Sequence, residues 1–176
     1  MIQRILCPTN FTEESKSGIA YALSLAKENG AQLVIFHATS FPSFTQYSAE
    51  LEDFYQWDRL VSKFKMDHVL AEAELRVRNF IRATFEIESN GVAWKTRVGL
   101  GNVAEEIVVA ALQEEVDLIV LARSEKGTLA RLFTGSISEA VSKSAPCLVL
   151  TIDATQAIWH SRGWRVPAFR EILQTS

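Results

Sequence analysis

The sequence predicts an α/β fold, a doubly wound and Rossmann-like domain in which helices cover both faces of a parallel sheet. Three observations support this fold. Five segments have the length and apolar character of strands, segments of helical periodicity separate them, and strand–helix–strand alternation at this spacing requires parallel crossovers. The expected strands are residues 2–7, 33–37, 92–98, 118–122 and 147–152.

The first two expected helices carry recognisable end signals. Thr12 is a capping residue at the start of the first helix, and Asn29-Gly30 is a C-terminal stop. The residues expected on its buried face are Ile19, Ala22, Leu23 and Ala26. The second helix is expected to run from about Arg59 into the high eighties, before Asn90-Gly91.

The third expected strand alternates between charged and apolar residues. Lys95 and Arg97 fall on the face opposite Trp94, a pattern typical of an edge strand with one wet face. Residues 99–101 are expected to form a turn, and residues 102–105 resemble a capping box that begins a helix. The residues expected on the inward face of that helix are Val103, Ile107, Ala110 and Ala111.

Composition places the chain among soluble globular domains. With 176 residues, of which 48% are hydrophobic and 22% charged, it is long enough for one domain with a sizeable core. The net charge of -3 offers no basic surface for nucleic acid, and no apolar run approaches membrane-spanning length. We therefore expect a cytoplasmic protein that binds neither nucleic acid nor membranes. Cys7 and Cys147 have no metal-ligand spacing and are expected as buried thiols.

Two segments fall outside the alternation of strands and helices. Residues 39–58 are an aromatic-rich connection, which is either a lid over a cleft or a packed loop. Residues 153–176 follow the domain, which is expected to end at 152, and form a tail with a short helix from Pro167. This tail docks either on its own domain or on a partner chain. Both segments are candidate surfaces for protein partners.

The most informative stretch for function is the loop after the fourth strand. Arg123, Lys126 and Arg131 bring three cations into or beside it, and Gly135-Ser136 then opens a helix. The loop is expected at the carboxyl end of a parallel strand, where the next helix points its free N–H groups and positive dipole end. α/β proteins bind phosphates at this place. An ordinary exposed turn is the alternative interpretation.

Taken together, four motifs resemble the universal stress protein family over roughly residues 2–152. These motifs are residues 4–15, residues 99–107, Asp117-Leu118-Ile119-Val120 and residues 135–147. The resemblance implies an adenine nucleotide alpha hydrolase-like fold whose sheet is ordered 3-2-1-4-5. It also implies a homodimer in which the fifth strands of two subunits pair and cover an apolar sheet edge. The residues of that interface are expected to be Leu148, Val149, Leu150, Thr151 and Ile152.

The family divides into members that bind ATP and members that do not. ATP binders carry a glycine, two residues, a glycine, nine residues, then glycine followed by serine or threonine. Here Gly135-Ser136 matches the last pair, but Ala122 and Glu125 stand at the first two glycines. Ala122 adds one methyl, whereas Glu125 adds a negative charge where a polyphosphate would lie. Like charges ~4 Å apart repel by about 1 kcal/mol even in water, and the three cations of the loop oppose this repulsion.

Other positions implied for the nucleotide come from the first, second and fourth strands and the last helix. At the adenine end, ATP binders place an aspartate where this chain has Asn10, which keeps hydrogen-bonding groups but loses the charge. The remaining candidate nucleotide-binding residues are Pro8, Thr9, Ala38, Leu121, Ile137 and Ser138. The pocket is therefore altered mainly at its phosphate end, which favours a ligand with fewer phosphates, such as AMP.

Catalysis has little support in the sequence. His37 ends an expected strand as a lone histidine, which is more often structural than a base. His68 and His160 lack the carboxylates or thiols of a metal site, and Ser136 and Ser138 have no evident histidine partner.

Two hypotheses of function remain, together with a weak third. The leading hypothesis is a dimeric stress-response interaction module that does not bind ATP in the usual mode. The alternative is an adenine nucleotide sensor that takes ATP or AMP, with Mg²⁺, through the modified loop 122–138. The third is a small phosphate-chemistry enzyme.

Overall fold

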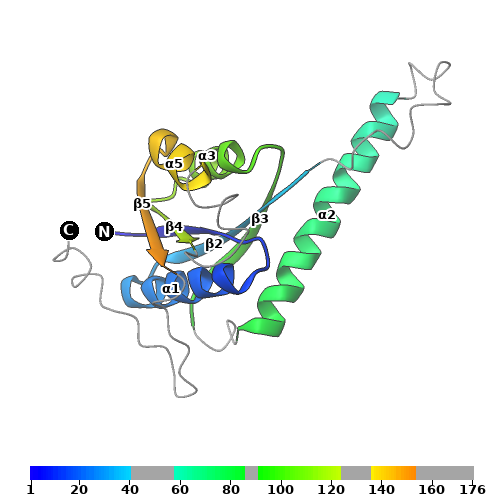
Figure 1. Cartoon of the computed structure of the whole chain (residues 1–176). Coiled ribbons are helices and arrows are strands. Elements are labelled where there is room, and N and C mark those ends of the chain that lie inside the picture. Colours follow the sequence, from blue (N-terminus) through cyan, green and yellow to red (C-terminus); the bar gives the residue numbers. More distant parts are fainter. Residues whose placement is uncertain (41–57, 86–90, 124–135, 154–176) are drawn as a thin grey trace.

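The computed structural model describes residues 1–40, 58–85, 91–123 and 136–153, without the side chains of residues 58–65, 123 and 136. These residues contain a five-stranded parallel sheet ordered β3-β2-β1-β4-β5 (Figure 1). Its strands are β1 (Arg4–Pro8), β2 (Gln32–Thr39), β3 (Trp94–Leu100), β4 (Leu118–Arg123) and β5 (Leu148–Asp153). The predicted fold class and strand order are therefore confirmed.

Helices cover both faces of the sheet, as a doubly wound fold requires (Figure 1). They are α1 (Glu13–Asn29), α2 (Asp58–Thr84), α3 (Val103–Gln113) and α5 (Ser136–Ser144). Side chains of β2 alternate between the two layers, because successive residues of a strand point to opposite faces. Leu33 and Ile35 pack on the side of α1 and α2, while Val34 and Phe36 pack on the side of α3 and α5.

Side-chain caps fix two of the helix starts where the sequence predicts them. The Thr12 hydroxyl accepts a hydrogen bond from the Ser15 N–H at 3.4 Å. The Asn102 side chain accepts from the N–H groups of Ala104 and Glu105 at 3.0 and 3.3 Å. Gly30 ends α1 in the left-handed conformation, with φ 64°, and donates its N–H to the Ala26 carbonyl. The predicted buried face of α1 is confirmed except at Leu23, which is only half-buried.

The ends of several elements differ from the expectation, and three differences matter most. Val103 is 37% exposed rather than inward, because it is the first residue of α3, whereas Ile107, Ala110 and Ala111 are buried as predicted. Residues 99 and 100 belong to β3 rather than to a turn, since they continue the pairing with Ala38 and Thr39 of β2. Finally, α2 ends at Thr84, before the high eighties.

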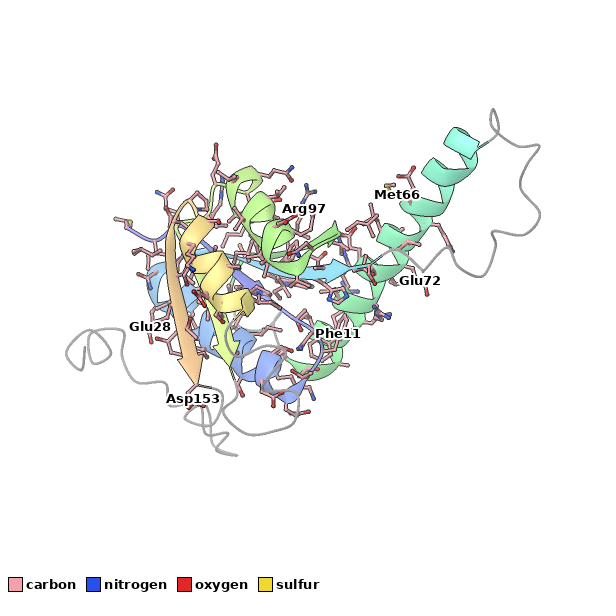
Figure 2. The ribbon with its side chains drawn as sticks, turned by 45° about the horizontal axis from the view of Figure 1, so that its top comes forward. Phe11, Glu28, Met66, Glu72, Arg97 and Asp153 are labelled. Atoms are coloured by element: carbon pink, nitrogen blue, oxygen red, sulfur yellow. The ribbon has the colours of Figure 1, made fainter. Side chains whose placement is uncertain are left out.

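The long helix α2 is only partly supported by the sheet. Ala73, Val77 and Ile81 are buried against it, while the N-terminal half of the helix projects away from the domain (Figure 1). Met66, in that half, points away from the core (Figure 2). No helix in the described part of the chain is long and apolar enough to cross a membrane. The aromatic-rich connection that precedes α2, apart from residues 39, 40 and 58, lies outside the described residues, as does the tail after Asp153.

The strand β3 lies at one edge of the sheet, as predicted, but the charged side chains on its exposed face form ion pairs at the end of α3. Lys95 forms an ion pair with Glu114 at the end of α3, and Arg97 Nε lies 3.8 Å from the same carboxylate. Arg97 also donates to Gln113 Oε1 at 2.5 Å, and Figure 2 shows it beside α3. The Glu114 side chain is only 15% exposed, so one largely buried carboxylate binds both cations of this edge.

The strand β5 forms the opposite edge and has an apolar start. Leu148 is 67% exposed, and Val149 and Leu150 are half-buried. No described residue covers this edge with a further strand. The two cysteines also differ in burial. Cys7 lies in the core, where burial raises the pKa of its thiol, whereas Cys147 is only partly buried instead of fully so.

Removing buried side-chain volume from the C-terminal half of α2 should destabilise the domain. We expect Ile81→Ala to lower the free energy of unfolding by about 3 kcal/mol, because it leaves a cavity between α2 and the sheet. Leu75→Ala, on the exposed side of the same helix, should change it by roughly 0.5 kcal/mol at most. Urea unfolding measures both. Equal small effects would mean that α2 does not pack on the sheet in solution.

Candidate functional site

The central strands β1 and β4 part toward their carboxyl ends. They pair only at Ile5 with Leu118 and Leu6 with Ile119, whereas β1 stays paired with β2 as far as Pro8. The chain leaves β1 toward α1 and enters β4 from α3, on opposite faces of the sheet. This is the topological switch point, at which open α/β sheets hold their ligands.

The amino ends of the same two strands are held together by one carboxylate. Asp117 Oδ2 accepts hydrogen bonds from the N–H groups of Gln3 at 2.7 Å and Arg4 at 2.9 Å. The Asp117 N–H in turn donates to the Arg4 carbonyl at 2.9 Å. The two hydrogen bonds that the carboxylate accepts lower the pKa of Asp117 below its ordinary value. The strands are therefore fastened at one end and separate at the other.

The turn after β1 carries Thr9, a predicted site residue that is only 5% exposed. Its Oγ1 accepts a hydrogen bond from the Phe11 N–H at 3.1 Å and lies 3.0 Å from the Ser15 hydroxyl. Because the Ser15 hydroxyl donates to the Thr12 carbonyl at 2.9 Å, Thr9 is the donor to Ser15. Its single hydroxyl proton is thus used inside the turn, and the side chain supports the site instead of donating to a ligand.

Asn10, the next residue, is exposed and its side chain is partly engaged. Its Oδ1 accepts from the Thr12 N–H at 3.3 Å and from the Thr12 hydroxyl at 2.8 Å. The Nδ2 group has no hydrogen-bond partner among the described residues. In this arrangement Asn10 offers N–H donors to a ligand, whereas an aspartate offers only acceptors.

A cluster of aromatic and basic side chains beneath this turn is a feature that the sequence did not reveal. Phe11 has φ 66°, a left-handed backbone conformation that is strained for a bulky residue and is fixed by the bond to Thr9 Oγ1. The centroid of its ring lies 4.6 Å from that of His37 and 5.2 Å from that of Phe80 in α2, and the Arg76 guanidinium carbon lies 5.1 Å above it. The cluster joins the turn to β2 and α2.

His37 is a structural member of this cluster. Its Nδ1 lies 2.8 Å from the Thr9 carbonyl oxygen, to which it donates. Burial lowers the pKa of His37, the hydrogen bond to Thr9 acts in the opposite direction, and the charge of Arg76 lowers it further. The predicted structural role of this histidine is consistent with these contacts.

The end of β4 carries two further predicted residues, which face opposite layers. Leu121 is buried on the side of α3 and α5, with Ala38 and Ile137 packed against the same layer. Ala122 lies on the side of α1, against Gly18. Pro8 ends β1, and Ser138 is half-buried in the first turn of α5. Residues from four elements therefore border the switch point.

The phosphate end of the predicted site lies largely outside the described residues. This holds for Glu125, Lys126, Arg131 and Gly135, and for the side chains of Arg123 and Ser136. Their roles stay predictions.

An open parallel sheet with its switch point between β1 and β4 defines a Rossmann-like α/β protein of the doubly wound class. Residues 1–153 match the model of the universal stress protein family, and the chain belongs to this family. It is 28% identical over 152 residues to universal stress protein MJ0531 of Methanocaldococcus jannaschii, covering 86% of this chain and 82% of that protein. The family predicted from four sequence motifs is thus confirmed.

Solved structures share the fold at lower sequence identity. A universal stress protein in complex with cAMP has a TM-score of 0.56 and 17% identity, covering 87% of this chain and 98% of that one. A universal stress protein family protein of Arabidopsis thaliana with AMP bound has a TM-score of 0.51 and 17% identity, covering 89% of this chain and 95% of that one. At this level of sequence identity, the similarity shows a shared fold and no more.

The half-buried position of His37 should make stability depend on pH. Because its pKa is lowered in the fold, the unfolded chain takes up the proton first as pH falls through the ordinary value of about 6.5. Its contribution is complete above that pH and is lost as pH falls toward the folded pKa. Urea unfolding at pH 8 and pH 5.5 should show a loss of stability that is smaller in His37→Gln. An NMR titration placing the His37 pKa above 6.5 would contradict this.

Proposed function

We propose that the chain is a universal stress protein that binds an adenine nucleotide with a single phosphate at the β1–β4 switch point. ATP in the family's usual mode is disfavoured. The observation that carries the proposal is the parting of β1 and β4 after Leu6 and Ile119, which leaves the carboxyl ends of two central strands without mutual pairing. A ligand at this place meets the turn after β1 and the end of β4 together.

The number of phosphates follows from the charge of the loop. Glu125 brings a negative charge to the position of a phosphate-loop glycine, and each further phosphate adds repulsion. One phosphate can still be neutralised by Arg123, Lys126 or Arg131, which precede α5 in the sequence. Relatives solved with AMP and with cAMP, each a ligand with one phosphate, support the same choice.

Recognition of the base is assigned to the turn after β1. The Asn10 amide N–H groups face no described partner, and the ring nitrogens of adenine are hydrogen-bond acceptors. Thr9 fixes the turn through Phe11 and Ser15, so it orients Asn10 without contacting the base through its hydroxyl.

We infer that the protein acts by binding a ligand and by assembling with other chains, and that it does not catalyse a reaction. His37 donates to the Thr9 carbonyl and packs against the Phe11 ring in a tilted arrangement, which suits a structural histidine better than a base. No group of three or more metal-ligating side chains occurs among the described residues. The cytoplasmic location, the domain limit at 152 and protein partners at the aromatic insert and the tail stay predictions from the sequence.

A homodimer through β5 is part of this proposal. Leu148 is 67% exposed in the single chain, and exposing a large apolar side chain on an unpaired strand invites pairing with another strand. Two copies related by a two-fold axis would cover each other's edge from Leu148 to Ile152.

Nucleotide binding is tested by calorimetric titration of nucleotide-stripped protein with AMP, ADP and ATP, with and without Mg²⁺. We expect saturable binding of AMP and about tenfold weaker binding of ATP. Glu125→Gly should raise the affinity for ATP more than the affinity for AMP. Absence of heat with all three nucleotides would leave the interaction-module hypothesis.

Glu125→Gln is the matched control, because it removes the charge and keeps the size. If charge repulsion limits ATP binding, Glu125→Gln should give most of the gain that Glu125→Gly gives. A gain in the glycine variant alone would mean that side-chain bulk, not charge, excludes the polyphosphate.

The dimer is tested by light scattering after gel filtration. Leu148→Asp should convert the dimer to a monomer, because it places a charge at the unpaired edge. Leu112→Asp changes a leucine of similar exposure on α3 and should leave the dimer intact. A wild-type monomer, or a Leu148→Asp dimer, would contradict pairing through β5.

A further inference from the structure

Gly18 is a buried residue in the interior of α1, on the side that faces the sheet. Glycine is unfavourable inside a helix, and nothing in the local sequence requires it there. The reason lies across the helix–sheet interface, at the end of β4. The function proposed above does not use this glycine.

A side chain at position 18 would collide with Ala122. A Cβ built on Gly18 would lie 2.9 Å from the Ala122 Cβ, 3.7 Å from the Ala122 backbone nitrogen and 3.6 Å from the Cys7 sulfur. Real Cβ atoms do not approach another methyl at 2.9 Å, so either α1 or the end of β4 would have to move. A methyl carbon bonded directly to the backbone cannot rotate out of the way, unlike the tip of a long side chain.

The same contact shows where the Ala122 methyl goes. It points toward α1, into the space that Gly18 leaves, and joins the core layer formed by α1 and α2. The residue at the first glycine position of the ATP-binding pattern therefore has its extra carbon accommodated by the helix behind the strand.

We propose that Gly18 is a positioning residue of the candidate nucleotide site, and that it forms a size-complementary pair with Ala122. Because Gly18 has no side chain, it leaves room for the methyl group of Ala122. The end of β4, which is followed by residues 124–135, can therefore carry alanine at position 122 without moving away from α1. The effect on ligand affinity rests on the proposed nucleotide site, whereas the pair itself does not.

The consequence for specificity concerns the two altered glycine positions. The methyl group that Ala122 adds lies in the core, against Gly18. On this proposal, only Glu125, at the second altered glycine position, distinguishes a ligand with one phosphate from one with three.

The pair is tested by a double-mutant cycle in thermal unfolding of the full chain. Gly18→Ala should lower the midpoint by about 5 °C, because it overpacks the interface between α1 and β4. Gly18→Ala combined with Ala122→Gly moves the methyl from strand to helix and should recover most of that loss. Ser17→Ala, at the neighbouring position of α1, where the side chain donates to the Glu13 carbonyl of the same helix, is the control and should show no comparable loss.

A purely structural role is separated from a positioning role by titrating the same variants with AMP. We expect Gly18→Ala to weaken AMP binding about tenfold at a temperature where it is fully folded, and the double variant to restore it. Equal and additive stability losses in the two single variants would overturn the pair. Unchanged AMP affinity in a destabilised Gly18→Ala would overturn the positioning role, as would a tenfold gain from Ala122→Gly alone.

The two proposals fail in different ways. If the wild-type protein binds no AMP, the proposed function fails, and the positioning role fails with it. The stability cycle then still decides whether Gly18 and Ala122 are a complementary pair.

Discussion

The pairing of β1 with β4 is the constraint on which the rest of the structure depends. Among the residues that the structure describes, it is the only strand pairing that joins β3, β2 and β1 to β4 and β5, and it consists of two residue pairs. Asp117 secures its amino end through the N–H groups of Gln3 and Arg4. Because this ladder stops at Leu6, the spacing between the carboxyl ends of β1 and β4 is set by side chains and helices instead. The turn after β1 and the contact between α1 and β4 take over that task.

The turn after β1 achieves its rigidity by satisfying its own polar groups. A chain of hydrogen bonds runs from the Phe11 N–H through Thr9 and Ser15 to the Thr12 carbonyl. This chain offsets the backbone strain at Phe11, and the ring of Phe11 is fixed further by His37 and Arg76. The hydroxyl protons used in this way cannot also be donated to a ligand, so the exposed Asn10 is the side chain through which the turn offers N–H donors.

Most of the fold could be predicted because its signals are local. Alternation along β2 and the caps at Thr12 and Asn102 depend on neighbours in sequence. The prediction that Val103 faces inward was wrong, because helical periodicity does not say at which residue a helix first contacts the sheet. The glycines at 99 and 101 suggested a turn, but pairing with β2 outweighed that preference. In the candidate site, Thr9 and Ala122 were found by motif. Their partners Ser15 and Gly18 were missed, since only the folded chain brings each pair together.

The two edges of the sheet differ in chemistry, and this difference sets how many strands can be added. At β3 the cations Lys95 and Arg97 are anchored to Glu114, which keeps charge along the edge, while β5 begins with an exposed leucine. A sheet with two receptive edges can grow without limit, like a filament. A sheet with one receptive edge can accept only one further strand. If β5 pairs with a second copy, as proposed above, the assembly is complete with two chains.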